Sequence, residues 1–219
     1  MKAAILTHYD KKGTNLEIQD IPVPVPEDDE ILVRIMVAAV NPLDNMIIRG
    51  AVKLIVPYKV PLIMGNEFSG VVEKTGKRAA RFKAGDRVYG RMPLKKIGAF
   101  AEYAAVKESA LADIPDNLSF EEAATVPLTA RSAMQAFEIM QVKPGESVFI
   151  SGGTGSLGAM AIPIARSLGL HVYTNGSAGN EERVRKLGAE KFIDYKKENC
   201  AEVLSDVDRV LDTLGDRAL

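Results

Sequence analysis

The sequence predicts a two-part protein, an all-β part followed by an α/β part with a parallel sheet. Before about residue 120, short strand-like runs are separated by turn residues. After it, helical and strand-like patterns alternate, which is typical of a parallel sheet with crossover helices. Within this second part, Ser147–Gly158 reads SVFISGGTGSLG and joins a strand to a helix through a glycine-rich turn. We therefore expect domains at residues 1–120 and 121–219.

The composition excludes several classes of partner. The chain has 219 residues with 28 basic and 29 acidic side chains, and this balance argues against nucleic acid as the main partner. No apolar run is long enough to span a membrane, and the N-terminal apolar segment is too short for a signal peptide. The single cysteine, Cys200, excludes an intrachain disulfide and fits a reducing cytoplasm. We expect a cytoplasmic protein.

The first part is expected to consist of short strands and one short helix. The prolines at 22, 24 and 26 predict an extended connector, because each fixes φ and lacks an N–H group. Asn41-Pro42 ends one strand and begins a helix at Leu43–Arg49, with Asp44 expected to cap that helix or to lie at the surface. The expected strands are Lys2–Leu6, Leu16–Asp20, Glu30–Val40, Gly70–Lys74, Arg87–Tyr89 and Glu102–Val106.

The second part is expected to begin with a capped helix. Ser119 and Glu122 have the spacing of a capping box, and Pro127 predicts a break before a second helical segment, Thr129–Met140. The alternation then predicts strands at 147–151, His171–Thr174, Lys191–Asp194 and Val207–Leu211, and helices at 156–168, Glu181–Leu187 and Asn199–Ser205.

The glycine-rich turn predicts a dinucleotide site. Gly153 is expected to allow the tight turn, Gly155 to let the backbone approach a pyrophosphate, and Gly158 to let helix and strand pack closely. The phosphates would bind N–H groups at the helix start. The alternative is an ordinary glycine-rich turn. The expected cofactor contacts here are Gly153, Thr154, Gly155, Ser156, Leu157 and Gly158.

The end of the next strand favours NADP(H) over NAD(H). An NAD site usually has Asp or Glu about 20 residues after the first glycine, where it binds the ribose. Here the strand is followed by Asn175, Gly176 and Ser177, all expected to contact the cofactor. Ser177 can donate a hydrogen bond to a 2′-phosphate, and Arg183 is a candidate charged partner. The alternative for Arg183 is a solvated helix residue.

Several ordered motifs carry a family resemblance. They are NPLD at Asn41–Asp44, GNEFSG at Gly65–Gly70, GDRV at Gly85–Val88, GAFAEY at Gly98–Tyr103, AATVPLTA at Ala123–Ala130, LGA at Leu187–Ala189 and IDY at Ile193–Tyr195. Together they resemble the medium-chain dehydrogenase/reductase superfamily, most of all its zinc-free NADPH quinone oxidoreductases. The resemblance implies a GroES-like β-barrel domain, a Rossmann domain, and an active site in the cleft between them.

The resemblance also implies roles for individual residues. Asn41 would contact the cofactor and donate a hydrogen bond to the substrate carbonyl, and Thr129 would lie at the nicotinamide. The alternative for Asn41 is a helix cap alone. Tyr195 would lie against the adenosine, while Asn180 occupies a position where some relatives carry a basic residue.

The ligands of a catalytic zinc are not found at the corresponding positions. Zinc-dependent members of the superfamily use a Cys after the third strand, the His of a Gly-His-Glu motif and a later Cys or Asp. In this chain the three positions fall at Val40-Asn41, at Asn66 and near Thr129, and none offers a thiolate, imidazole or carboxylate. We therefore expect no metal.

The expected activity is hydride transfer from NADPH to a quinone or an α,β-unsaturated carbonyl. The alternatives are a zinc-independent alcohol or aldehyde dehydrogenase and a non-catalytic NADPH-binding protein. A complete dinucleotide-binding fold has six strands, and this sequence predicts four of them. We accordingly expect the 219 residues to be part of a longer polypeptide, which the resemblance implies is a homodimer at full length.

Overall fold

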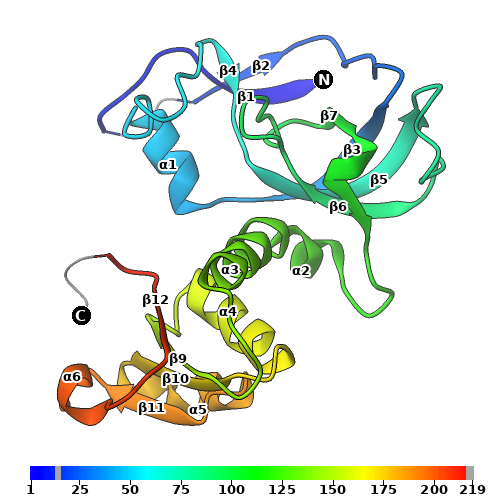
Figure 1. Cartoon of the computed structure of the whole chain (residues 1–219). Coiled ribbons are helices and arrows are strands. Elements are labelled where there is room, and N and C mark those ends of the chain that lie inside the picture. The colour runs from blue at the N-terminus through cyan, green and yellow to red at the C-terminus, as the bar shows by residue number, and fades with distance from the viewer. Residues whose placement is uncertain (13–15, 216–219) are drawn as a thin grey trace. The chain divides into compact units, whose positions relative to one another are not determined.

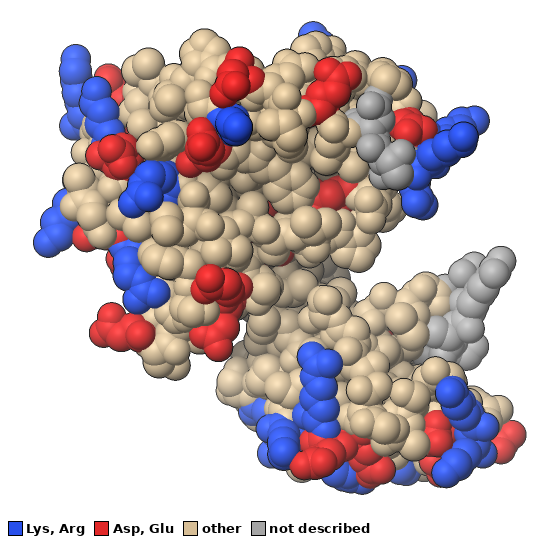
Figure 2. All heavy atoms as spheres, turned by 180° about the vertical axis from the view of Figure 1, so that it is seen from behind, with Lys and Arg blue, Asp and Glu red and all other residues tan. Residues whose placement is uncertain are grey.

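The computed structural model describes residues 1–12 and 16–215, and the chain divides into two compact units, Met1–Leu128 and Thr129–Leu219 (Figure 1). Within the described residues, no helix is long and apolar enough to cross a membrane. Figure 2 shows one face of the molecule, on which basic and acidic side chains are interspersed rather than separated by sign.

The first unit is built from antiparallel sheets, as the short alternating runs predicted. A five-stranded sheet has the order β7-β3-β5-β6-β8, and a three-stranded sheet has the order β2-β1-β4. The strands are β1 Lys2–Leu6, β2 Glu17–Asp20, β3 Glu30–Ala39, β4 Leu62–Ile63, β5 Glu67–Thr75, β6 Arg87–Arg91, β7 Tyr103–Lys107 and β8 Leu111–Asp113. The helices are α1 Pro42–Ile48, the 3₁₀ turn η1 Glu108–Ala110, and α2 Phe120–Ala124.

Two strands of this unit were not expected, and one begins earlier than expected. The strands β4 and β8 have only two and three residues, too few to show an alternating pattern. The strand β5 begins at Glu67, three residues before the expected Gly70. Its first four residues are all buried, although Glu67 and Ser69 are polar, so residue type alone does not reveal how this stretch is placed.

The pairing of β3 with β5 brings the polar residues after β3 close to those at the start of β5. These strands are antiparallel, and Ala39 at the end of β3 is paired with Glu67 at the start of β5. The residues just after β3 therefore lie beside those just before β5. Apolar side chains of the same sheet, including Val33 and Phe68, are fully buried in the core of this unit.

The second unit contains a four-stranded parallel sheet in the order β11-β10-β9-β12. This order equals 3-2-1-4 in strand sequence, the first part of a doubly wound dinucleotide-binding sheet. The elements are α3 Pro127–Met140, β9 Ser147–Ser151, α4 Ser156–Ser167, β10 His171–Gly176, η2 Ala178–Asn180, α5 Glu181–Lys186, β11 Lys191–Asp194, α6 Cys200–Val203 and β12 Arg209–Asp212.

The expected elements of the second unit are present with shifted ends. The expected helical break lies at residues 125–126, between α2 and α3. The second segment begins at Pro127 itself, two residues before the expected Thr129, because the first helical position needs no N–H group. The strand β10 runs on to Gly176, past the expected end at Thr174. The helix α6 is limited to Cys200–Val203. The core of this unit includes β9, whose inner residues are all buried, as expected for a central parallel strand.

Candidate functional site

Three glycines at the turn after β9, Gly152, Gly153 and Gly158, could not be replaced without strain or displacement. Gly152 has φ of 72°, one residue before the position, Gly153, at which we expected the tight turn. A Cβ atom on Gly153 would lie 1.9 Å from Thr174 Oγ1. A Cβ atom on Gly158 would lie 2.3 Å from the carbonyl oxygen of Gly152, so the absence of a side chain here lets α4 lie close to the turn.

Gly155 has a different environment from its neighbouring glycines. It is exposed, it is the N-cap residue of α4, and the closest atom to an added Cβ would be the Gly152 carbonyl oxygen at 3.4 Å. Ser156 and Leu157 follow in the first turn of α4, where helical N–H groups have no intrahelical acceptor. The backbone there is suited to bind an anion at the positive end of the helix.

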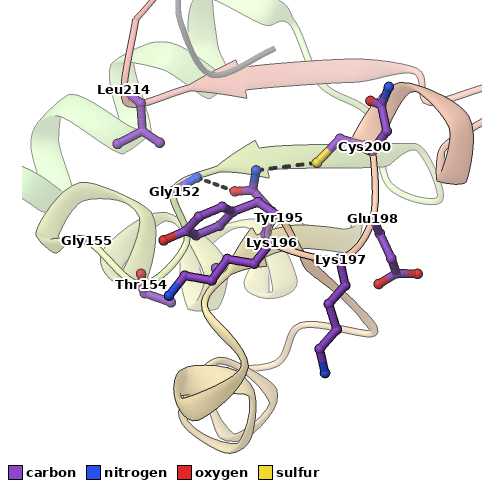
Figure 3. A pocket seen from close by; sticks show the side chains of 12 residues that line it. Gly152, Thr154, Gly155, Tyr195, Lys196, Lys197, Glu198, Cys200 and Leu214 are labelled. Carbon is purple, nitrogen blue, oxygen red and sulfur yellow. Dashed lines mark hydrogen bonds between the residues drawn. The ribbon is translucent and has the colours of Figure 1, made fainter.

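A cavity of about 830 Å³ lies beside this turn, at the carboxyl ends of β9, β10 and β11 (Figure 3). Its lining comes from the glycine turn, the end of β10, the segment after β11, and one residue after β12. The lining residues are Gly152, Thr154, Gly155, Asn175, Gly176, Tyr195, Lys196, Lys197, Glu198, Asn199, Cys200 and Leu214. Cavities of this size accommodate nucleotide-sized ligands.

The structure brings five of the expected cofactor contacts together in this cavity: Thr154, Gly155, Asn175, Gly176 and Tyr195. The other expected contacts in this unit are not among its lining residues. They are Thr129, Gly153, Ser156, Leu157, Gly158, Ser177 and Arg183. Of these, Gly153 and Gly158 are buried in the turn, and Arg183 is exposed on α5.

Sequence reasoning missed most of the segment after β11. Residues 196–200 and Leu214 line the cavity but were not among the expected contacts. A signal was available, because carboxyl ends of adjacent parallel strands lie at the same edge of a sheet. Gly176 of β10 is paired with Asp194 of β11, so the residues after Asp194 reach the edge that carries the glycine turn.

Asn175 connects the two sides of the cavity. Its side-chain oxygen accepts the Gly152 N–H group at 2.7 Å, and its side-chain nitrogen lies 3.4 Å from Cys200 Sγ. Asn175 is buried, so the bond to Gly152 satisfies a backbone donor that water does not reach. The dashed lines in Figure 3 mark both interactions.

The end of β10 carries no carboxylate, as the sequence predicted. Asn175 and Gly176 end the strand, and Ser177 follows. The Ser177 hydroxyl oxygen accepts a hydrogen bond from the Asn180 side-chain amide at 3.0 Å. The cations that line the cavity are Lys196 and Lys197.

A second group of polar residues is buried in the first unit, where β3 ends and β5 begins. Asn41, Asp44, Asn66 and Glu67 are between 1% and 8% exposed. Asn41 Nδ2 donates to Glu67 Oε1 at 2.7 Å, and Asn66 Nδ2 donates to Asp44 Oδ1 at 2.7 Å. Buried polar side chains need hydrogen-bond partners, and these two contacts provide them.

Both buried carboxylates use both of their oxygen atoms. Asp44 Oδ2 accepts the backbone N–H group of Asn41 at 2.7 Å, so Asp44 does cap α1, but it is buried rather than at the surface. Glu67 Oε2 accepts the backbone N–H group of Leu128 at 2.7 Å. Asn41 is thus held through its backbone by Asp44 and through its side chain by Glu67.

Burial also changes the acid–base behaviour of this network. Desolvation raises the pKa of the Asp44 carboxyl above its ordinary value, although hydrogen bonds from Asn41 and Asn66 oppose the shift. Desolvation likewise raises the pKa of Glu67, opposed by hydrogen bonds from Asn41 and Leu128, and the nearby Asp44 charge adds to the increase.

The family resemblance implies that Asn41 and Asn66 of this network correspond to zinc-ligand positions in metal-dependent relatives. In this structure the Asn66 amide is bonded to Asp44. Within residues 1–12 and 16–215, no three His, Cys, Asp or Glu side chains are grouped so that they could hold a metal ion. Thr129, the other expected catalytic residue, is buried in the first turn of α3 and belongs to the second unit.

Comparisons with known proteins agree with both units. The profile of the alcohol dehydrogenase GroES-like domain matches residues 27–116. The chain is 34% identical to a 2-methylene-furan-3-one reductase of Solanum lycopersicum over 98% of this chain and 57% of the relative. It is 32% identical to an NADPH-dependent alkenal/one oxidoreductase of Arabidopsis thaliana over 98% of this chain and 58% of the relative. The chain therefore spans little more than half the length of these two relatives.

A solved structure gives the same result in three dimensions. The quinone oxidoreductase from Coxiella burnetii superposes with a TM-score of 0.87 and 30% sequence identity. The alignment covers 99% of this chain and 69% of that protein. Both units of this chain therefore have counterparts in that solved structure.

Proposed function

Because this chain belongs to the medium-chain dehydrogenase/reductase superfamily and is similar to its quinone oxidoreductases, we propose that it serves the transfer of a hydride from NADPH to a quinone or an α,β-unsaturated carbonyl, without a metal ion. The observation that carries this proposal is the cavity at the glycine turn, with no carboxylate at the end of β10. A carboxylate there would repel the 2′-phosphate that distinguishes NADPH from NADH.

In this proposal the second unit binds the cofactor. The fit is supported by the exposed backbone at Gly155 and by the first turn of α4, which offers N–H groups to a pyrophosphate. Tyr195 lines the same cavity and would lie against the adenosine. When bound, NADPH supplies the hydride. Thr129 would contact the nicotinamide.

The residue that we assign to the substrate carbonyl is Asn41. A side-chain amide nitrogen carries two hydrogens, and one of them is bonded to Glu67. Because the amide group is planar, this bond fixes the direction of the second hydrogen, which we assign to the oxygen that gains negative charge during hydride transfer. A donor held in advance stabilises that charge without reorganisation. Asn41 is thus proposed to act as a donor as well as a helix cap.

Steady-state oxidation of NADPH tests the proposal directly. The purified chain is assayed with quinones, with enones, and with simple aldehydes as a control class that lacks the conjugated alkene. We expect turnover with quinones or enones that is unchanged by a chelator. Turnover with aldehydes alone, or loss of turnover with the chelator, would favour a metal-dependent or alcohol-type dehydrogenase. NADPH binding without any turnover would favour a non-catalytic NADPH-binding protein.

We also propose a cytoplasmic location and a homodimeric assembly. The single cysteine supports the first, and the resemblance to dimeric relatives supports the second. Cell fractionation and light scattering of the purified protein test the two points separately.

A further inference from the structure

The segment after β11 places two lysines at the cofactor cavity. Asp194 ends β11 and is paired with Gly176, the last residue of β10. Lys196 and Lys197 follow two and three residues later, and both line the cavity. They therefore lie beside the end of the second strand of the sheet, where dinucleotide-binding folds bind the adenosine ribose.

The two lysines differ in their surroundings. Lys197 Nζ is 3.9 Å from Asp194 Oδ2, whereas Lys196 has no ion pair with any residue that the structure describes. In Figure 3 the Lys196 side chain extends toward Thr154 of the glycine turn, on the same side as Tyr195. The side chains of Lys197 and Glu198 point away from that turn. The carboxylate of Glu198 is thereby directed away from an anion bound beside Lys196.

Arg183 and Asn180 are less suited than Lys196 to bind an anion in this cavity. Arg183 is exposed on α5 and does not line the cavity. Asn180 is uncharged, and its amide donates to the Ser177 hydroxyl at 3.0 Å. A 2′-phosphate carries about two negative charges near neutral pH, so a site for it needs a cation.

On the basis of the proposed cofactor site, we propose that Lys196 binds the 2′-phosphate of NADPH and sets the preference for NADPH over NADH. This role replaces the one expected of Arg183. Lys196 forms a charge-assisted contact with the phosphate, and Tyr195 packs beside the adenosine. The backbone N–H group of Lys196 donates to Asp194 Oδ1 at 3.2 Å, which holds the start of this turn against β11.

A pair of fragments isolates the phosphate contact from the rest of the cofactor. The nucleotides 2′,5′-ADP and 5′-AMP differ only in the 2′-phosphate, and their affinity for the whole 219-residue chain can be measured by calorimetry. We expect Lys196→Ala to weaken binding of 2′,5′-ADP by about tenfold or more, as loss of a charge-assisted contact does. Binding of 5′-AMP should change by less than about twofold.

Two further variants serve as controls. Lys197→Ala removes a neighbouring cation of the same cavity that is directed elsewhere, and Arg183→Ala removes the cation named from the sequence. Both should leave the affinity for 2′,5′-ADP within about threefold of the original. Lys196→Arg should retain most of the affinity, because the charge is kept. Thermal unfolding of each variant establishes that the fold is intact.

The possible outcomes separate this inference from the proposed function. If the unaltered chain prefers 2′,5′-ADP but Lys196→Ala does not weaken it, the inference is wrong while the NADPH assignment stands. If Arg183→Ala has the larger effect, the role belongs to Arg183. If the unaltered chain does not prefer 2′,5′-ADP, or binds neither fragment, the NADPH assignment itself fails, and Lys196 has no such role.

Discussion

The side-chain amide of Asn41 donates a 2.7 Å hydrogen bond to the buried carboxylate of Glu67. The two residues are separated by 26 positions in the sequence, and the antiparallel pairing of β3 with β5 brings them together. Glu67 in turn accepts the N–H group of Leu128. The buried carboxylate of Glu67 thus serves as an acceptor for both a side-chain amide and a backbone group.

Replacing Asn41 tests both of its roles. We expect Asn41→Ala to lower turnover by about tenfold or more, through loss of a donor to developing charge. It should also lower the free energy of unfolding by about 1–3 kcal/mol, because a buried oxygen of Glu67 loses its partner. Kinetics and urea unfolding measure the two effects. Asn45→Ala, an exposed amide on the same helix, controls for stability and should change it by less than about 0.5 kcal/mol. Normal turnover would leave Asn41 as a helix cap.

The raised pKa of Glu67 predicts how its contribution to stability depends on pH. As the pH rises past the ordinary value of 4.5, the unfolded chain loses this proton first, so the free energy of unfolding falls until the folded carboxyl also ionises. Glu67→Gln removes this titration. The stability of Glu67→Gln relative to the unaltered chain should therefore increase as the pH rises above 4.5, until the folded carboxyl has ionised.

Urea unfolding across this pH range measures that difference. Glu138→Gln, which removes an exposed carboxyl from α3, reports the effect of changing a surface charge over the same range. A relative stability of Glu67→Gln that stayed constant or decreased with pH would show that the pKa of Glu67 is not raised in the folded protein. Asp44 has a raised pKa for the same reason, so its protonation adds a dependence of the same sign in both proteins.

Alanine variants at two glycines of the turn should affect stability and NADPH binding separately. Gly158→Ala places a Cβ atom 2.3 Å from the Gly152 carbonyl oxygen and should lower stability by about 1–3 kcal/mol. Gly155→Ala has no such contact and should leave the melting temperature nearly unchanged. It should nevertheless weaken NADPH binding, since the added methyl group projects where the phosphates would approach. Gly179→Ala, with open space around its Cβ, is the control for both measurements. If Gly155→Ala bound NADPH as tightly as the unaltered chain, the assignment of the pyrophosphate to this turn would be wrong.

Asn175 should be needed for the shape of the cavity. Asn175→Ala leaves the Gly152 N–H group without its acceptor, which should lower the free energy of unfolding by about 1–3 kcal/mol. The turn would also lose its connection to the end of β10, so affinity for NADPH should fall. Asn175→Asp keeps an acceptor for Gly152 and should recover stability. Failure of this variant to recover any stability would show that the bond to Gly152 is not the important one.

Sequence patterns predicted the fold well because both units rest on local periodicity. Alternation marked most strands of the first unit, and the change to helix–strand alternation predicted the parallel sheet. The short strands β4 and β8 were missed, since a pattern of two or three residues carries no period. The exact division between domains, expected at residue 120, remains a prediction.

The candidate site was harder to predict because its contacts join distant segments. The glycine turn is contiguous, so its role could be inferred from spacing alone. The position of Lys196 depends on how β10 and β11 pair, and the burial of Asp44 depends on an amide from Asn66. Neither relationship appears in a linear pattern of residue types. The catalytic roles of Asn41 and Thr129 remain predictions.

The contact between Asn175 and Cys200 gives the protein a built-in chemical reporter. The only thiol of the chain lines the cavity wall and is tied, through one side chain, to the backbone of the glycine turn. If a nucleotide fills the cavity, we expect it to cover the sulfur. The rate at which a small alkylating reagent modifies the thiol should therefore report how far a nucleotide occupies the cavity, without any need for a substrate.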